Sequence, residues 1–135
     1  MNPAEELSVI GDLKDTFTVL GHKFAVQTLD SDAEIMVTSG SAPFDKETKE
    51  HVYRLEKLVR AIITIDGVPF SVTEEEKAKG MNEVQKARKL LYKWHPPVVK
   101  RVYDEFLKLE QKRDEAVAAL EKNAPTPTTS TGAGK

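Results

Sequence analysis

The three histidines, His22, His51 and His95, are the side chains of this sequence best suited to proton transfer or metal binding near neutral pH. They lie far apart in the sequence, and no two of them are spaced to share one helix face. The chain has no cysteine either, so it lacks the closely spaced His and Cys ligands of a zinc site. We expect His22 in a turn, His51 on a charged helix face and His95 at a helix end, and we predict no metal site.

The carboxylates follow patterns of local structure rather than of catalysis. Asp66 is followed by Gly67 at the end of an apolar run, which is typical of a turn. Thr73 precedes Glu74, Glu75 and Glu76, and a Thr with a Glu three positions later forms a capping box at a helix start. The sequence has no Gly-rich phosphate loop, nucleophile elbow or nucleotide-binding fingerprint. We therefore predict no catalytic residue and no cofactor, and a protein that is not an enzyme.

Basic residues gather in one stretch of the sequence and are the best argument for a nucleic-acid partner. The stretch contains Lys86, Arg88, Lys89, Lys93, Lys100 and Arg101. It is interleaved with Glu83, Asp104 and Glu105, and the whole chain has 20 basic and 22 acidic residues with a net charge of −2. Such a balance gives no field that favours a polyanion, so nucleic acid is not favoured as the main partner. A non-enzymatic DNA-binding or regulatory module stays an alternative.

Length and composition predict a single domain with a tail. The chain has 135 residues, and residues 1–122 can form one domain, whereas 123–135 are too rich in Pro, Thr and Gly to bury anything. The longest apolar run, Ala61 to Ile65, is far shorter than a membrane span, and the acidic start has no apolar signal-peptide core. We expect a soluble protein with a flexible tail, no membrane partner and no disulfide.

A hairpin is expected over about residues 16–29. Two runs rich in β-branched and aromatic residues flank Gly21-His22, which is typical of a type II′ turn. Phe17 and Val19 would share one face, and Phe24 and Val26 alternate on the return strand. Because an isolated hairpin is marginally stable, one face must rest on a helix or on another chain, and an unpaired strand edge would favour self-association.

Helical periodicity accounts for most of the remaining chain. Asp30 is expected to cap a short helix through about Val37, with a loop at 38–43 and a long helix from Asp45. The inward face of the long helix is expected to contain Val52, Leu55, Leu58, Val59, Ile62 and Ile63. Its outward face is expected to contain Lys46, Glu47, Lys49, Glu50, Arg54, Glu56, Lys57 and Arg60. Residues 62–65 are β-branched and could instead form a strand that pairs with 68–72.

A helical hairpin is predicted around the Trp94-His95-Pro96-Pro97 corner. The first helix would run from Thr73 to His95, weakened at Gly80, and the second would start at the prolines. The inward face of the second helix is expected to contain Val98, Val99, Val102, Phe106 and Leu109 and, more weakly, Ala116, Val117 and Leu120. Trp94 is expected to anchor the core at this corner. The predicted fold is therefore mainly α (α+β), with the N-terminal β-hairpin packed on a small bundle of amphipathic helices and a disordered C-terminal tail.

Three motifs give the chain a resemblance to a known family. They are Gly-x-x-Phe-x-Val-x-Thr-Leu at 21–29, Leu-x-x-Ala-Ile-x-x-Ile-Asp-Gly at 58–67, and Trp-His-Pro-Pro-Val-Val from Trp94, followed by Tyr-x-x-Phe-x-x-Leu. In this order the motifs resemble the small tail assembly chaperones of long-tailed bacteriophages. The resemblance implies a protein of the host cytoplasm that binds the tape measure protein, keeps it soluble and helps to recruit tail tube subunits.

The physical character of the chain fits a binder of that kind, because amphipathic helices and strand edges can cover an apolar helical partner, with several copies associating. The apolar residues that we expect to contact partners are Phe17, Val19, Phe24, Val26, Trp94, Val98 and Phe106. A small structural baseplate or tail-completion component of the virion is the alternative within the same setting.

Overall fold

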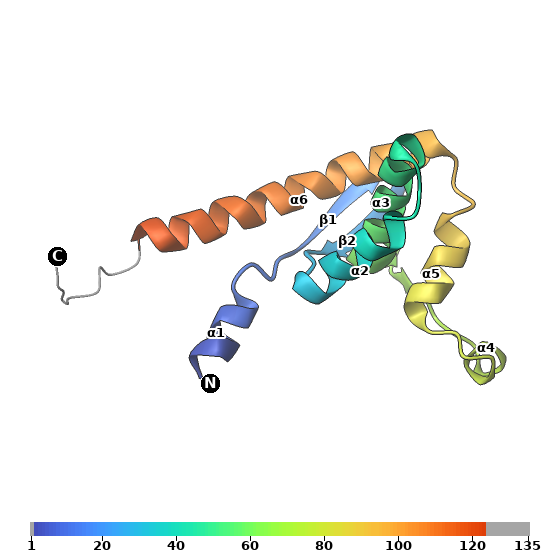
Figure 1. Ribbon diagram of the computed structural model, residues 1–135, viewed down its shortest axis with the longest axis horizontal. Coiled ribbons are helices and arrows are strands. Elements are labelled where there is room, and N and C mark those ends of the chain that lie inside the picture. Colours follow the sequence, from blue (N-terminus) through green and yellow to red (C-terminus); the bar gives the residue numbers. More distant parts are fainter. Residues whose placement is uncertain (1, 124–135) are drawn as a thin grey trace.

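The computed structural model describes residues 2–123, which form helices and a four-stranded sheet (Figure 1). In chain order the elements are α1 (Pro3–Val9), β1 (Lys14–Val19), β2 (His22–Gln27), α2 (Ser31–Ser41), α3 (Lys46–Ala61), β3 (Ile62–Ile65), β4 (Val68–Pro69), α4 (Glu74–Ala78), α5 (Glu83–Leu91) and α6 (Pro96–Asn123). The predicted α+β class, with an N-terminal hairpin and a helical majority, is confirmed. The tail predicted for 123–135 lies outside the described residues, apart from Asn123, which is the last residue of α6.

The sheet is antiparallel in the order β1-β2-β3-β4, and both of its outer hairpins close with two-residue turns. In the first turn Leu20 and Gly21 have φ angles of 54° and 81°, between the paired residues Val19 and His22. Two positive φ angles define a type I′ turn, so the predicted type II′ turn one residue later is wrong. Asp66 and Gly67 form the second turn in the same way. Residues 62–65 form the strand that the sequence left as an alternative, so Ile62 and Ile63 are not on α3 as expected, and the pairing expected with 68–72 is limited to Val68–Pro69.

Only one face of the sheet meets the helices. Phe17 pairs with Phe24, and Phe24 pairs with Ile65, so these three side chains share that face. They join a core that contains the buried residues Val19, Phe24, Val26, Leu55, Leu58, Val59, Ala61, Ile62, Ala87, Leu91, Val99, Val102, Tyr103, Phe106 and Leu109. The core therefore lies between the sheet and helices α3, α5 and α6.

Helix α2 is longer than its sequence suggested. It begins after the predicted cap, because the side chain of Asp30 accepts a hydrogen bond from the Ala33 backbone N–H. It then continues to Ser41 through residues expected in a loop. Val37 and Ser41 are buried, and α2 packs along α3. Burial against α3 outweighs the weak helix propensity of the Ser- and Gly-containing segment.

The helix predicted between Thr73 and His95 is two helices. The Thr73 capping box starts α4 as expected, but Gly80, with a φ angle of 84°, ends this short helix. A second capping box, in which Asn82 and Gln85 exchange hydrogen bonds, starts α5. The chain turns again at Trp94, and Pro96 is the first residue of α6, which confirms the predicted proline corner.

The two ends of the described chain extend away from this core on the same side (Figure 1). Helix α1, in the acidic start of the chain, contains no buried residue. In α6 the buried residues end at Glu110, although Val117 and Leu120 were expected on the inward face. The core is too short to reach them, so the distal part of α6, residues 111–123, projects beyond it.

Candidate functional site

All of the residues predicted to contact partners except Val98 belong to the core or pack against it. Val19, Phe24, Val26 and Phe106 are at most 4% exposed. Phe17, Trp94 and Val98 are half-buried. The Phe17 ring stacks on Phe24 at 5.4 Å between centroids, and Trp94 meets Phe24 edge-on at 6.3 Å.

The apolar face of the hairpin is therefore largely covered in the folded monomer, and contact of its side chains with a partner stays a prediction. The helices of the chain itself already cover that face of the sheet, and the opposite face presents exposed Thr16, Thr18 and Lys23. The prediction that Trp94 packs at the helical corner agrees with its contact to Phe24.

The middle of α3 contains a buried carboxylate that the sequence placed on the solvent face. Glu56 is 3% exposed and receives hydrogen bonds from Arg60 at 2.8 Å, from Arg88 at 2.7 and 3.0 Å, and from the Tyr92 hydroxyl. Burial alone would raise the pKa of Glu56. The hydrogen bonds that Glu56 accepts and the charge of Arg88 outweigh burial and lower this pKa to about 2. Glu56 is therefore ionised and joins α3 to α5.

The next residue, Lys57, makes a second buried cluster on another side of α3. Its Nζ lies 2.6 Å from Glu110 Oε2 of α6 and 3.2 Å from Glu34 Oε2 of α2. Burial favours neutral Lys57, but the hydrogen bond to Glu110 and the charges of Glu110 and Glu34 raise its pKa. Its Nζ also lies 5.3 Å from the centroid of the Tyr53 ring.

These two clusters connect helices. Together they join α3 to α2, α5 and α6 through charged groups that are paired. No buried side-chain nitrogen or oxygen of the described residues lacks a hydrogen-bond partner. Paired, buried charges fix the geometry between helices, because a misplaced helix would leave a charge buried alone.

The histidines and the turn carboxylate lie apart from these clusters. His22 Nδ1 is 2.5 Å from Asp66 Oδ2, and Asp66 Oδ1 accepts the Lys23 backbone N–H at 2.7 Å, so the pair joins the two hairpin turns. The Lys23 N–H and the His22 contact lower the pKa of Asp66. His51 is on α3, and the carbonyl of His95 accepts backbone N–H groups of the first turn of α6. No group of three or more potential metal ligands occurs among residues 2–123.

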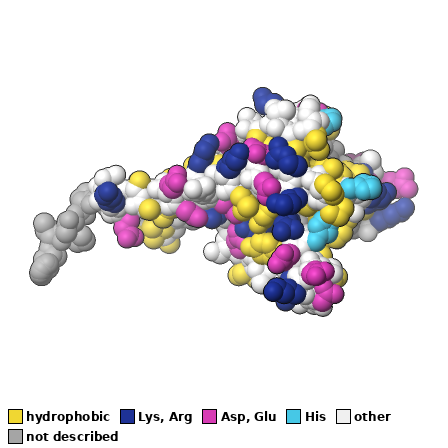
Figure 2. Space-filling model, turned by 90° about the horizontal axis from the view of Figure 1, so that it is seen from above, with side chains coloured by type: hydrophobic (Ala, Val, Ile, Leu, Met, Phe, Trp, Pro, Cys, Tyr) yellow, Lys and Arg dark blue, Asp and Glu magenta, His cyan; other side chains and the backbone are white. Residues whose placement is uncertain are grey.

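Members of the basic stretch are largely neutralised by carboxylates. Ion pairs join Lys86 to Glu76, Arg88 to Glu56, Lys100 to Asp104 and Arg101 to Glu105. Figure 2 shows Lys and Arg side chains interspersed with Asp and Glu over one face of the molecule. Cations that are already paired with carboxylates neutralise fewer phosphates, so this pairing disfavours a phosphate-backbone partner, and the prediction that nucleic acid is not the main partner stays a prediction.

Apolar side chains that the core does not cover include residues at α1 and on the distal part of α6, as well as Ile35 and Met36 of α2, which are 61% and 56% exposed. Leu7 is 68% exposed, Ile10 43%, and on α6 Leu120 is 55% exposed. Val117 is also exposed, although it approaches the backbone of Gly11, where an added Cβ would lie 3.8 Å from Val117 Cγ2. We take the exposed apolar side chains beside Gly11, on α1 and the distal part of α6, as the candidate functional site of the described chain.

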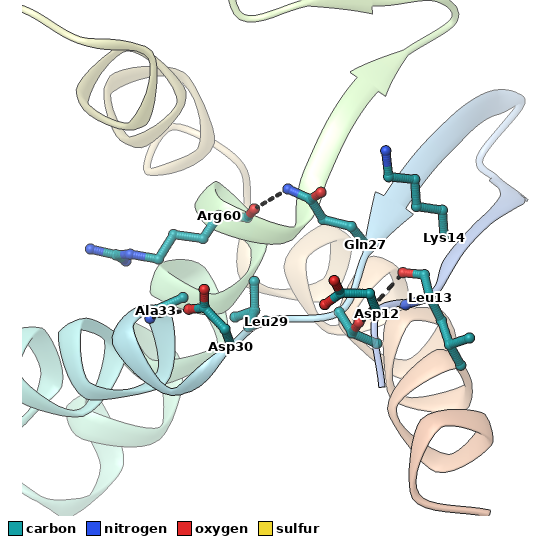
Figure 3. A pocket seen from close by; sticks show the side chains of 9 residues that line it. Asp12, Leu13, Lys14, Gln27, Leu29, Asp30, Ala33 and Arg60 are labelled. Carbon is teal, nitrogen blue, oxygen red and sulfur yellow. Dashed lines mark hydrogen bonds between the residues drawn. The ribbon is translucent and has the colours of Figure 1, made fainter. Parts of the chain in front are cut away.

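Two hollows adjoin this surface and share Asp12, Leu29 and Asp30. The first, about 500 Å³, lies where the start of β1 and the end of β2 meet α2 and Arg60 (Figure 3). The second, about 600 Å³, has Leu7, Ile10 and Arg113 among its lining residues. Figure 3 shows the carboxylates of Asp12 and Asp30 at the first hollow, and the Gln27 side chain donating to the Arg60 carbonyl.

Sequence reasoning missed α1, although a signal was present. Asn2 and Glu5 have the spacing of a capping box, and their side chains and backbones exchange both hydrogen bonds of that motif. With Pro3 in the first turn, this pattern would have predicted a helix with Leu7 and Ile10 one turn apart.

Comparisons with known proteins leave the function open. None of the helices in the described part of the chain combines the length and apolar character that a membrane span needs. Searches against protein-family models, curated proteins and solved structures found no match to this chain.

Proposed function

We propose that this protein is a non-enzymatic assembly chaperone that binds an apolar helical protein and keeps it soluble. In the setting suggested by the sequence motifs, the partner is the tape measure protein of a long-tailed bacteriophage, bound in the host cytoplasm before tail tube subunits join. Several copies of the chain would cover one tape measure protein, because a single small domain cannot cover a long helical rod.

One observation carries this proposal. Leu7 of α1, Ile10 directly after it and Leu120 on the distal part of α6 have exposed apolar side chains that do not belong to the core. Exposed apolar side chains that gather on two helices are typical of a surface that another protein covers. An amphipathic helix of the partner is a suitable occupant, since helices present apolar stripes of matching length.

The direct test is coexpression with the tape measure protein encoded in the same genome. We expect a tape measure fragment that is insoluble alone to become soluble in a complex with several copies of this chain, measured by the soluble fraction and by native mass spectrometry. Burial of apolar surface drives such binding, so the complex should persist at moderate salt.

A matched control uses His95→Ala, since His95 is exposed and precedes the first residue of α6, at the opposite end of that helix from its distal part. This variant should rescue solubility as well as the wild type does. Failure of the wild type to solubilise the fragment would contradict the proposal. Detection of the protein in purified phage particles, at stoichiometric amounts by mass spectrometry, would instead favour a structural component of the virion.

A further inference from the structure

Helix α1 is an element without a packing partner of its own. It has seven residues, a complete capping box and no buried residue. Isolated helices shorter than about 12–15 residues are marginal in water, so a cap alone contributes too little to hold α1 in place. Its apolar side chains, among them Leu7 and Ile10, would gain stability if another apolar surface covered them.

A groove runs between α1 and the distal part of α6. Its floor is the second hollow, which is lined by Leu7 of α1, by Ile10 and Gly11 directly after it, by the start of α2, and by Arg113 of α6. Val117 extends the α6 wall, because it contacts the Gly11 segment, and Leu120 follows one turn later on the same helix face. We call this the α1–α6 groove. Leu7 and Ile10 make one side of the groove apolar, whereas on the α6 side Arg113 lines the hollow and the exposed apolar residues Val117 and Leu120 lie beyond it.

The rim of the α1–α6 groove is acidic. Asp12, Asp30, Asp32 and Glu34 line the hollow, and Glu5 and Glu6 lie in the first turn of α1. Only Glu34 has an ion pair among these hollow-lining acids of residues 2–123, with Lys57. The one cation that lines the hollow, Arg113, is already paired with Asp114 at 2.9 Å and lies 4.0 Å from Glu110. The rim therefore favours cations on whatever enters the groove.

We propose that the α1–α6 groove binds an amphipathic helix of the partner whose apolar stripe is flanked by lysines and arginines. This inference rests on the proposed function and names the partner segment by its chemistry. The apolar stripe covers Leu7, Ile10 and Leu120, and the basic flanks lie against Asp12 and Asp32. Burial supplies the affinity, and the acidic rim selects basic helices over acidic ones.

The test uses two labelled synthetic helical peptides with the same leucine stripe, one flanked by lysines and one by glutamates, titrated into the full-length protein by fluorescence anisotropy. We expect the lysine peptide to bind at least about ten-fold more tightly than the glutamate peptide. Added salt should reduce this preference several-fold without abolishing binding of the lysine peptide. Equal affinities for the two peptides, or a preference for the glutamate peptide, would overturn the inference.

Substitutions locate the binding in the groove. Leu7→Asp and the double variant Asp12→Lys/Asp32→Lys should each weaken binding of the lysine peptide about ten-fold or more, because each removes one of the two recognition features. The matched controls are Leu90→Asp on α5, where Leu90 is 42% exposed, and Glu50→Lys on α3, where the Glu50 side chain is 63% exposed. Both controls should bind within about two-fold of the wild type. Circular dichroism checks that each variant is folded, and Leu120→Asp is a second test on the other wall should Leu7→Asp unfold.

Two outcomes separate this inference from the proposed function. If the wild type solubilises the tape measure fragment and Leu7→Asp and Leu120→Asp do so equally well, the groove is not the site although the chaperone role stands. If the wild type sediments as a dimer that Leu7→Asp converts to a monomer, a second copy of the chain covers the groove, and the inference is wrong. If the wild type does not solubilise the tape measure fragment but binds the lysine peptide in the groove, only the chaperone role is contradicted.

Discussion

At the scale of single residues, Glu56 is the side chain on which the helix packing depends most. Its carboxylate joins Arg60 of its own helix to Arg88 and Tyr92 at the end of α5. We expect Glu56→Gln to destabilise the protein by about 3 kcal/mol, since it leaves Arg60, whose side chain is 10% exposed, and the partly exposed Arg88 without their counterion. Urea denaturation measures this, with Glu50→Lys as an exposed control on the same helix. A change below about 1 kcal/mol would show that solvent replaces the network.

The lowered pKa of Glu56 predicts how the stability of the protein depends on pH. The folded pKa of Glu56, about 2, lies below its ordinary value of 4.5, so the ionised carboxylate stabilises the fold above pH 4.5. This contribution is lost as the pH falls from 4.5 toward 2. The difference in unfolding free energy between wild type and Glu56→Gln should therefore be largest near neutral pH and shrink in strong acid. A difference that stayed constant with pH would contradict this assignment.

Trp94 offers a second prediction at the residue scale. Its ring is half-buried and packs edge-on against Phe24, at the corner between α5 and α6. Trp94→Ala should cost about 2–4 kcal/mol, somewhat less than full burial would imply. The measurement is chemical denaturation, and binding of the lysine-flanked peptide serves as the control, because Trp94 does not line the α1–α6 groove. Unchanged stability with lost binding would place Trp94 at an interface instead.

At the scale of elements, the break between α4 and α5 decides how the segment from 73 to 95 is arranged. Gly80 has a φ angle of 84°, and no atom lies within 4 Å of the position that its Cβ would take. Gly80→Ala should therefore cost about 1–2 kcal/mol through backbone strain alone, without a clash. Gly40→Ala inside α2 is the matched control, because its Cβ would make ordinary contacts with Glu56 at 3.5 Å. Thermal unfolding of both variants checks the contrast, and equal effects would rule out backbone strain as the cause.

At the scale of the whole molecule, the structure separates a core that determines stability from projecting helices available for binding. Since α1 contains no buried residue, deletion of residues 2–9 should change the melting temperature by less than about 3 °C. The same deletion should abolish rescue of the tape measure fragment, because it removes one wall of the α1–α6 groove. Calorimetry and coexpression measure the two effects. A large drop in melting temperature would show that α1 packs against the body in solution.

Several parts of this protein follow from the sequence alone because their causes are local. The capping box at Thr73, the Asp66-Gly67 turn, the proline start of α6 and the β-branched strand at 62–65 depend on residues within a few positions of one another. The apolar periodicity of α3 likewise predicted its buried face, including Val52, Leu55 and Val59. These local patterns were sufficient for the fold class.

Only the tertiary structure decided which side chains of the helices and of the hairpin are buried. Glu56 and Lys57 read as solvent-facing by periodicity, yet they are buried because their partners, Arg88 and Glu110, come from distant helices. The apolar hairpin residues became core for the same reason, since α3, α5 and α6 cover that face of the sheet. The candidate site consists of apolar side chains that the core does not cover. Periodicity shows that a helix has an apolar face, but only the length of the core decides that Val117 and Leu120 extend beyond it. Only the tertiary structure brings the Gly11 segment, which follows α1, beside Arg113 and Val117 of α6, so that α1 and α6 lie on two sides of one groove.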